Sequence, residues 1–209
     1  MGQADKIRAY RIAARQMKMA HSRAALLQSA SIDSTARRPA DARWYCLFVN
    51  PGRVFAVENV LREANVEFCL PREKVVSMHR GRKIERERAM FPGYLPVRFV
   101  PSAPAFQAFK RMSGVFDFVG GIDGYYSIPD KHIQRLRLWE TGGDPTRVET
   151  DKTMAEGDKA EIIFGPFAGL RCIVLAVKWS RQARARVLVR DKGVELEIQS
   201  IPLAFLQKL

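Results

Sequence analysis

The chain has 209 residues, and its 35 Lys and Arg against 22 Asp and Glu give a net charge of +13. It has no apolar run near the roughly 20 residues that a membrane-spanning helix needs and no signal-peptide core, so we expect a cytoplasmic protein without membrane contact. The three cysteines, Cys46, Cys69 and Cys172, are too few and too far apart for a disulfide framework or a zinc site. The excess of positive charge favours a polyanionic partner, usually nucleic acid, over a basic surface that only aids solubility.

Residues 1–40 differ from the rest, with eight Lys and Arg against only Asp5 and Asp33. From Asp5 to Leu27 a helical period places Arg8, Arg11, Arg15 and Lys18 on one face. The apolar stripe on the other face is too thin to pack strongly. We therefore expect a basic arm that is disordered or partly helical when free and that folds on a partner. An organelle transit peptide is the second interpretation.

Residues 41–140 read as one α+β domain with an antiparallel sheet and flanking helices. In chain order we expect a strand at 44–49, a helix at 54–64, strands at 66–70 and around 75–76, a basic hairpin at 79–88, a strand at 90–100, a short helix from 104, a strand at 114–121 and a helix at 129–139. Pro96 lacks a backbone donor, so the strand that holds it must be an edge strand or be bulged there.

Residues 141–154 have almost no large apolar side chains and contain Gly142, Gly143 and Pro145, which indicates a linker. Residues 155–209 then show short alternating segments with regular turns, at 159–164, 172–179, 184–189 and 194–198. This pattern predicts a small all-β barrel as a second domain.

Several segments, in order, resemble the NusG family of transcription elongation factors. They are RWY at 43–45, FPGY at 91–94, GVFDFVGG at 114–121, EGD at 156–158 and FGPFAG at 164–169. The last two resemble the opening of a KOW domain. The resemblance implies a bacterial protein whose N-terminal domain binds the clamp helices of RNA polymerase and promotes processive elongation, while the KOW domain recruits other factors.

By this resemblance the polymerase contact would include aromatic anchors, which are enriched at binding hot spots. We expect it at Tyr45, Phe91, Pro92 and Tyr94, with Trp44 as a core residue. Ser102 lies where the family's domain meets the opposite side of the polymerase cleft, although a solvated turn explains it equally well.

Two basic groups could touch exposed non-template DNA or the upstream duplex through its phosphates. The first, near the helix at 54–64, is Arg53, Asn59 and Arg62; the second, on the basic hairpin, is Arg82, Lys83, Arg86 and Arg88. Glu85 and Glu87 interrupt the second group, which weakens it as a continuous track of cations.

The segment at 190–193, around Asp191, is shorter than the family's usual loop. That loop helps the family bind a small-subunit ribosomal protein or the termination factor Rho, so both partnerships are in doubt here. We therefore favour a specialised paralogue, closer to RfaH-type operon-specific antiterminators, and expect a monomer.

Catalysis is not expected. The three histidines, His21, His79 and His132, are scattered, and no nucleophile–base spacing, phosphate-binding loop, cofactor motif or paired metal ligands accompany them. The rival function is a KOW-type RNA- or ribosome-binding protein without a polymerase role. The complete domain before the KOW segment argues against it.

Overall fold

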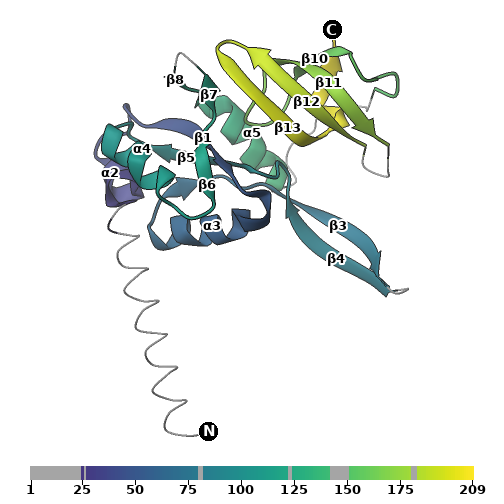
Figure 1. Cartoon of the computed structure of the whole chain (residues 1–209). Helices are drawn as coiled ribbons and strands as arrows, with labels where there is room; N and C mark the ends of the chain where they lie inside the picture. The colour runs from purple at the N-terminus through teal and green to yellow at the C-terminus, as the bar shows by residue number, and fades with distance from the viewer. Residues whose placement is uncertain (1–24, 26, 80–81, 122–123, 142–150, 180–182) are drawn as a thin grey trace, which may run out of the picture.

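The computed structural model describes residues 25, 27–79, 82–121, 124–141, 151–179 and 183–209. The helical period expected over residues 5–27 lies almost wholly outside the described residues, as does most of the expected linker. Figure 1 shows an N-terminal α+β domain, with its sheet, helices and a projecting hairpin, and a C-terminal all-β domain packed against it. The predicted fold class is confirmed.

A five-stranded antiparallel sheet is the centre of the N-terminal domain, in the order β2-β5-β1-β6 with β9 also paired to β1. Its strands are β1 (Arg43–Val49), β2 (Glu67–Phe68), β5 (Tyr94–Phe99), β6 (Val115–Phe118) and β9 (Ser127–Ile128). β1 is central because it pairs with three strands. The expected strands at 44–49 and 90–100 are therefore neighbours, although the second begins only at Tyr94.

The two faces of this sheet belong to two different hydrophobic clusters, because side chains alternate along a strand. Tyr45, Leu47 and Val49 of β1 point into one cluster, and Trp44 and Cys46 point into the other. The first cluster is closed by α3 (Val54–Glu63) and α4 (Ala103–Lys110). The second is closed by α5 (Asp130–Glu140) and by the C-terminal domain. The sheet is thus buried on both sides, as the apolar run at 44–49 predicts.

Pro96 is tolerated in β5 because its ring nitrogen faces the side where β2 has ended. Pro96 pairs with Cys46 of β1 on one side. On the other side its carbonyl accepts a hydrogen bond from Cys69 N, just beyond β2. At this position β5 is an edge on one side only, which is the geometry that proline requires.

A two-stranded hairpin projects from the domain (Figure 1), formed by β3 (Arg72–His79) and β4 (Arg82–Ala89). The tip at 80–81 and the side chains of residues 76–79, 82 and 83 are outside the described set. A smaller ribbon, β7 (Gly120–Gly121) with β8 (Gly124–Tyr125), was not expected from the sequence.

Part of the segment expected to be an arm is folded onto the domain. It forms a 3-10 turn, η1 (Gln28–Ala30), and a short helix, α2 (Ile32–Ala36), and both Leu27 and Ala30 are buried. The described part of residues 1–40 therefore extends the hydrophobic cluster under α3 and α4.

The C-terminal domain is a five-stranded antiparallel sheet in the order β13-β12-β11-β10-β14. Its strands are β10 (Lys159–Ile162), β11 (Arg171–Lys178), β12 (Arg184–Asp191), β13 (Val194–Pro202) and β14 (Leu206–Lys208), with η3 (Leu203–Phe205) before the last. Within the described residues no ladder joins β13 to β14, so the barrel is not closed. The turn between β12 and β13 has only Lys192 and Gly193, with φ of 50° and 72°, as in a tight hairpin.

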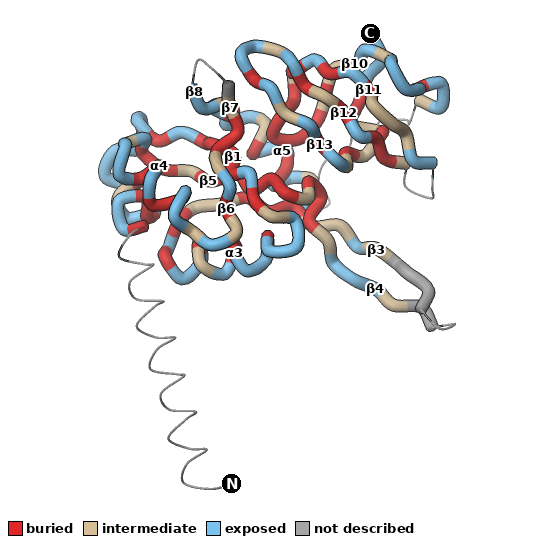
Figure 2. The backbone as a smooth tube through the Cα atoms, viewed as in Figure 1, coloured by how far each residue is buried: buried red, intermediate tan, exposed pale blue. Residues whose placement is uncertain are grey.

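The two domains share one hydrophobic cluster, which appears in Figure 2 as buried chain between α5 and the C-terminal sheet. The cluster joins Trp44, Phe91 and Tyr94 to Phe164 and Phe167. No described helix is both long enough and apolar enough to cross a membrane.

Candidate functional site

The FPGY segment forms a fixed turn that leads into β5. Met90 N donates to Pro71 O at 2.9 Å, and Tyr94 N donates to Phe91 O at 3.1 Å. Gly93 has a φ of 91°, which a residue with a side chain adopts only with strain, and its carbonyl accepts from Val49 N. This turn directs Phe91 and Tyr94 toward the same side of the sheet as Trp44.

The C-terminal domain covers both aromatic side chains, which are only 3% and 4% exposed. The Phe91 ring lies 6.0 Å from that of Phe205, and the Tyr94 ring meets Phe167 edge-on at 5.1 Å. Tyr94 Oη donates to Glu197 O at 2.9 Å. Burial raises the pKa of Tyr94, so this hydroxyl stays protonated and can serve as the donor. The segment expected to contact a partner is thus occupied by the protein's own second domain.

A buried arginine of β12 joins the domains beside this contact. Arg184 is 8% exposed, and its Nη1 binds Glu73 Oε1 at 2.9 Å. Its Nη2 donates to Met90 O at 2.8 Å, and its Nε donates to Ser200 Oγ at 2.6 Å. Burial lowers the pKa of Arg184, and the Glu73 carboxylate opposes that shift. A buried guanidinium needs such partners, so the network depends on the domains remaining together.

A second set of contacts comes from α5. Arg135 Nη1 donates to Ile163 O at 3.2 Å, and its guanidinium lies 5.2 Å from the centre of the Phe164 ring. Arg137 lies over Trp44 at 5.2 Å and pairs with Glu67 at 2.9 Å. The helix therefore supports Trp44 from one side and holds the C-terminal domain from the other.

The aromatic surface continues beyond the covered part. Phe48 stacks on Tyr94 with ring centres 5.7 Å apart, and Phe116 lies 5.2 Å from Phe48. Phe48 is 41% exposed and Phe116 is 57% exposed. Sequence reasoning missed both residues; the signal was the pairing of Phe48 with Tyr94, which only the register reveals. Exposed aromatic side chains next to a buried aromatic cluster are typical of a protein-binding surface.

Of the other three residues expected at the polymerase contact, two lie in different surroundings. Tyr45 is on the opposite face of the sheet, where its ring lies within 5.2 Å of Phe99 and 5.1 Å of Phe106. Ser102 caps α4 by accepting from Ala105 N at 3.3 Å. Pro92 is half-buried in the turn beside Phe91. The structure thus brings together Phe91, Pro92 and Tyr94 and leaves Tyr45 and Ser102 apart from them.

The three basic or polar residues expected near α3 do not form one group. Arg53 Nη1 donates to Ser113 Oγ at 3.0 Å, on the side of the helix that faces α4. Arg62 pairs with Glu58 at 2.7 Å and lies over Phe68, on the side that faces the hairpin. Asn59 is exposed.

The hairpin separates the charges that alternate in the sequence. Arg86 is paired with Val75 and Arg88 with Glu73, whereas Glu85 and Glu87 point to the opposite face of the ribbon. Arg88 Nη2 binds Glu73 Oε1 at 2.6 Å. The side chains of Arg82 and Lys83 are outside the described set. Glu85 and Glu87 therefore do not interrupt the face that carries Arg86 and Arg88.

Comparison with known proteins gives one consistent result. The family model described as "Transcription termination factor nusG" matches residues 42–137. The transcription termination/antitermination protein NusG of Escherichia coli K12 is 30% identical over 179 residues, which cover 78% of this chain and 96% of that protein. The NusG of Pseudomonas aeruginosa is 30% identical over 142 residues, covering 65% and 78%.

Solved structures give weaker similarity. A structure described as "Domain interaction in Thermotoga maritima NusG" matches with a TM-score of 0.41 and 20% identity, over 81% of this chain and 98% of that one. The MjSpt4:Spt5 complex matches with a TM-score of 0.27 and 16% identity, over 79% and 97%.

Proposed function

The chain belongs to the NusG family of transcription termination and antitermination factors, and we propose that it binds the clamp helices of RNA polymerase through the aromatic surface of its N-terminal domain. This surface comprises Phe91, Pro92 and Tyr94, which the C-terminal domain covers, and Phe48 and Phe116, which remain exposed. Bound there, the protein would promote processive elongation in the bacterial cytoplasm, without catalysing a reaction itself.

The observation that carries the proposal is that one aromatic surface is partly covered and partly open. Phe48 touches Tyr94 on one side and Phe116 on the other, so the exposed rings continue the covered ones. An apolar surface of this kind binds a complementary protein surface. In the free molecule, the C-terminal domain provides that complementary surface for Phe91 and Tyr94.

Polymerase binding would then require the C-terminal domain to leave. A partner that needs Phe91 and Tyr94 binds only the open fraction of the molecules, so its apparent affinity falls by that fraction. The contacts of Arg184 with Glu73 and of Tyr94 with Glu197 set how small the fraction is. The closed conformation therefore lowers the apparent affinity for polymerase.

DNA contacts are the second part of the proposal. On the hairpin, Arg86 is exposed, and among the described residues it has no carboxylate partner. On the α4 side, Arg53 is exposed and bonded only to a serine hydroxyl. Both guanidinium groups are free to bind phosphates of non-template or upstream DNA. Arg62 and Arg88 already pair with Glu58 and Glu73, so we expect these two arginines to contribute less to DNA binding.

The C-terminal domain would bind other factors once released. Its β12–β13 turn has only two residues, and Lys192 is tied to Gly169 O at 2.8 Å. Because this turn offers no apolar side chain, binding of Rho or a small-subunit ribosomal protein would need another surface. We propose that the protein is a specialised paralogue and not the housekeeping factor.

The test compares binding of core RNA polymerase by the full chain and by two double variants. Phe48→Ser with Phe116→Ser removes exposed rings that the C-terminal domain does not cover, and we expect at least tenfold weaker binding. The matched control is Leu138→Ser with Ile173→Ser, since Leu138 and Ile173 are 55% and 40% exposed on other elements. It should bind as the wild type does.

Two results would count against the proposal. Equal binding by the wild type and the Phe48/Phe116 variant would remove the aromatic surface from the interface. A wild-type chain that ignores polymerase but captures ribosomal subunits would instead support the KOW-type RNA- or ribosome-binding function.

A further inference from the structure

A cleft of about 400 Å³ lies where the two domains meet, beside the Arg184 network. The N-terminal domain lines it with the start of β3, Met90 and the end of α5, and the C-terminal domain lines it with the start of β12 and with η3. Sites for small molecules typically measure about 300–1,000 Å³, so this cleft has room for one small ligand. Because each domain supplies one side, the cleft exists only while the domains are docked.

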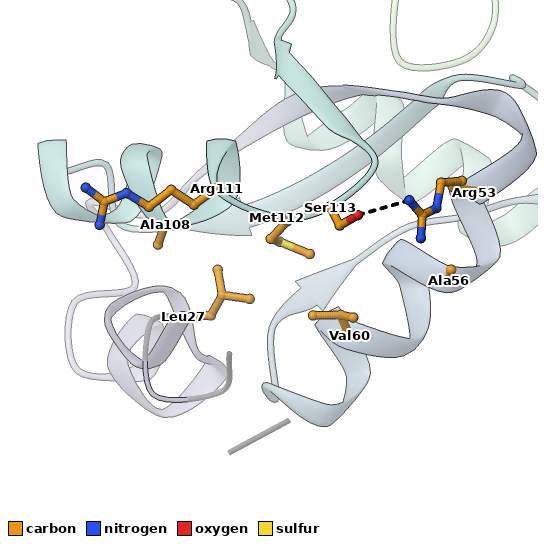
Figure 3. Close-up of a pocket in the computed structure, with 8 residues that line it drawn as sticks. All are labelled: Leu27, Arg53, Ala56, Val60, Ala108, Arg111, Met112 and Ser113. Carbon is orange, nitrogen blue, oxygen red and sulfur yellow. Dashed lines mark hydrogen bonds between the residues drawn. The ribbon is translucent and has the colours of Figure 1, made fainter. Parts of the chain in front are cut away.

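The cleft differs in this respect from the cavity of about 180 Å³ between α3 and α4 (Figure 3). Every residue that lines that cavity, Ala56 among them, belongs to the N-terminal domain. A ligand there would touch one domain only and would be indifferent to docking. Ala56 is therefore suited to a control substitution.

Two aromatic side chains line the interdomain cleft, one from each domain. Trp139 near the end of α5 and Phe205 of η3 are both only partly buried. Phe205 is held in place by Phe164, with ring centres 4.6 Å apart, and by Phe91 at 6.0 Å. Among the described residues, none accepts a hydrogen bond from the indole N–H of Trp139. Fixed aromatic side chains of this kind bind a flat ring by stacking.

The free edge of β3 brings hydrogen-bonding groups to the same cleft. In the described chain β3 pairs only with β4, and Met90 N donates to Pro71 O just before the first pair of that ladder. Hydrogen-bonded and non-hydrogen-bonded pairs alternate in an antiparallel ladder, so Arg72 and Lys74 occupy non-hydrogen-bonded positions. The backbone N–H and C=O of Lys74 therefore point away from β4, and Lys74 lines the cleft. A donor beside an acceptor complements the edge of a nucleobase.

The ammonium group of Lys74 is available for an anion. Its neighbour Arg72 pairs with Glu58 at 2.7 Å and with Glu87 at 2.9 Å, and Arg184 is committed to the buried network. Lys74 is exposed, and within the described part of the chain it has no carboxylate partner. A lysine in this situation binds a phosphate as a point charge.

We propose that the interdomain cleft binds one nucleotide, with its base against Trp139 and Phe205 and hydrogen-bonded to the backbone of Lys74, and with its phosphate at the Lys74 ammonium group. Because the ligand needs both sides of the cleft, it binds the docked form and stabilises that form. The consequence for polymerase rests on the proposed function: a nucleotide that holds the C-terminal domain in place keeps Phe91 and Tyr94 covered. The binding of the nucleotide does not depend on that function.

The first experiment is calorimetric titration of the full chain with AMP, GMP, CMP and UMP. At least one of them should bind with a dissociation constant below about 1 mM. Inorganic phosphate should bind at least about tenfold more weakly, because it cannot stack. Trinucleotides run in parallel distinguish a free nucleotide from a base in a strand. Lys74→Gln should weaken binding of the monophosphate and leave that of the corresponding nucleoside unchanged.

Two pairs of variants locate the site. Trp139→Leu should weaken binding at least about fivefold, because it removes a stacking surface. Its control is Trp179→Leu, since Trp179 is 53% exposed and does not line the cleft. Ala204→Trp places a large side chain in the cleft and should abolish binding, whereas Ala56→Trp does the same in the cavity of Figure 3 and should not. Thermal unfolding curves confirm that each variant is folded at the temperature of the titration.

The effect on docking is measured without polymerase. With spin labels on α3 and β12, a saturating nucleotide should enlarge the population at the short distance. Polymerase affinity should then fall by up to about tenfold at a nucleotide concentration ten times the dissociation constant. If the distances respond to the nucleotide and polymerase binding does not, the proposed function fails and the nucleotide site stands.

Four outcomes would overturn the inference. One is that none of the four monophosphates binds. The second is an equal loss in the Trp139→Leu and Trp179→Leu variants. The third is unchanged binding by Ala204→Trp, which would place the ligand elsewhere. The fourth is saturation by a nucleotide without any change in the distance between α3 and β12, which would show that the ligand does not depend on docking.

Discussion

The ring of Phe91 lies directly against Gly165, at the point where the N-terminal domain meets the loop after β10. A Cβ added to Gly165 would collide with three atoms of that ring. We therefore expect Gly165→Ala to open the domains, because overpacking at such a contact costs about 1–3 kcal/mol. Spin labels on α3 and β12 would report the opening as a longer distance. Polymerase affinity should rise with the open fraction.

Gly169→Ala is the control for this substitution. Gly169 also has a positive φ, 82° against 99° for Gly165, but nothing lies within 4 Å of the added Cβ. Both variants therefore carry backbone strain, and only the first carries the clash. Equal spin-label distances between α3 and β12 in the Gly165→Ala and Gly169→Ala variants would mean that the Phe91 contact does not hold the domains together.

The Arg184–Glu73 pair should respond asymmetrically to removal of either partner. Glu73→Met leaves Arg184 buried without a carboxylate, which typically costs about 3–5 kcal/mol. Arg184→Met leaves Glu73 paired with Arg88 at 2.6 Å, so we expect a smaller effect on docking. The double variant should recover part of the loss from Glu73→Met. The spin-label distances would measure domain opening in the two single variants and the double variant. Identical opening in the two single variants would contradict the expected asymmetry.

Acid should destabilise the folded protein through His132. Burial lowers the pKa of His132, and Lys131, Arg135 and Lys192 lower it further. Its Nδ1 is buried and has no hydrogen-bond partner among the described residues. A lowered pKa means that the folded protein favours the neutral ring, so this stabilisation is present above the ordinary pKa near 6.5 and is lost as pH falls through the folded value.

The measurement is the free energy of unfolding by urea between pH 8 and pH 5, for the wild type and His132→Gln. The wild type should lose more stability than the variant over this range. If the two curves run parallel, His132 does not contribute to the pH dependence.

Arg86→Gln should weaken binding of duplex DNA and flatten its salt dependence by about 0.9, as expected for one lost phosphate contact. Arg190→Gln is a suitable control, since Arg190 is equally basic but pairs with Glu195 at 2.8 Å. Anisotropy titrations at several salt concentrations would distinguish them. Similar losses in both variants would show that net charge, and not the hairpin face, determines binding.

Local pattern predicted most elements of the fold. Period-two and helical spacing predicted β1, α3, α4 and α5 to within a few residues, because their apolar side chains face one or two cores. The two-residue strands β8 and β9 were missed, since segments so short have no period. Leu27 was assigned to an arm because a single apolar residue in a basic segment does not reveal that it is buried.

The candidate site was harder to predict because it depends on contacts between distant residues. The run at 44–49 is apolar on both faces, so it could not show which of the two faces the C-terminal domain covers. Arg184 looks like an ordinary surface cation in an alternating strand, and only its approach to Glu73, 111 residues away, makes it a buried partner. The alternating charges of the hairpin lie on opposite faces of β4, which follows once residues 82–89 are known to form one continuous strand.

The order of the two domains along the chain has a consequence for the protein while it is being made. Phe91 and Tyr94 lie in the half of the chain that leaves the ribosome first, whereas every strand that covers them comes after Lys159. Between the end of α5 and the end of β14 there are roughly 70 residues, which take about 3–14 s to synthesise. During that interval the aromatic surface of a nascent chain has no cover. In a cell that translates its messages beside the transcribing enzyme, the proposed polymerase contact would therefore be open to each new molecule for a short period before its own C-terminal domain closes over the site.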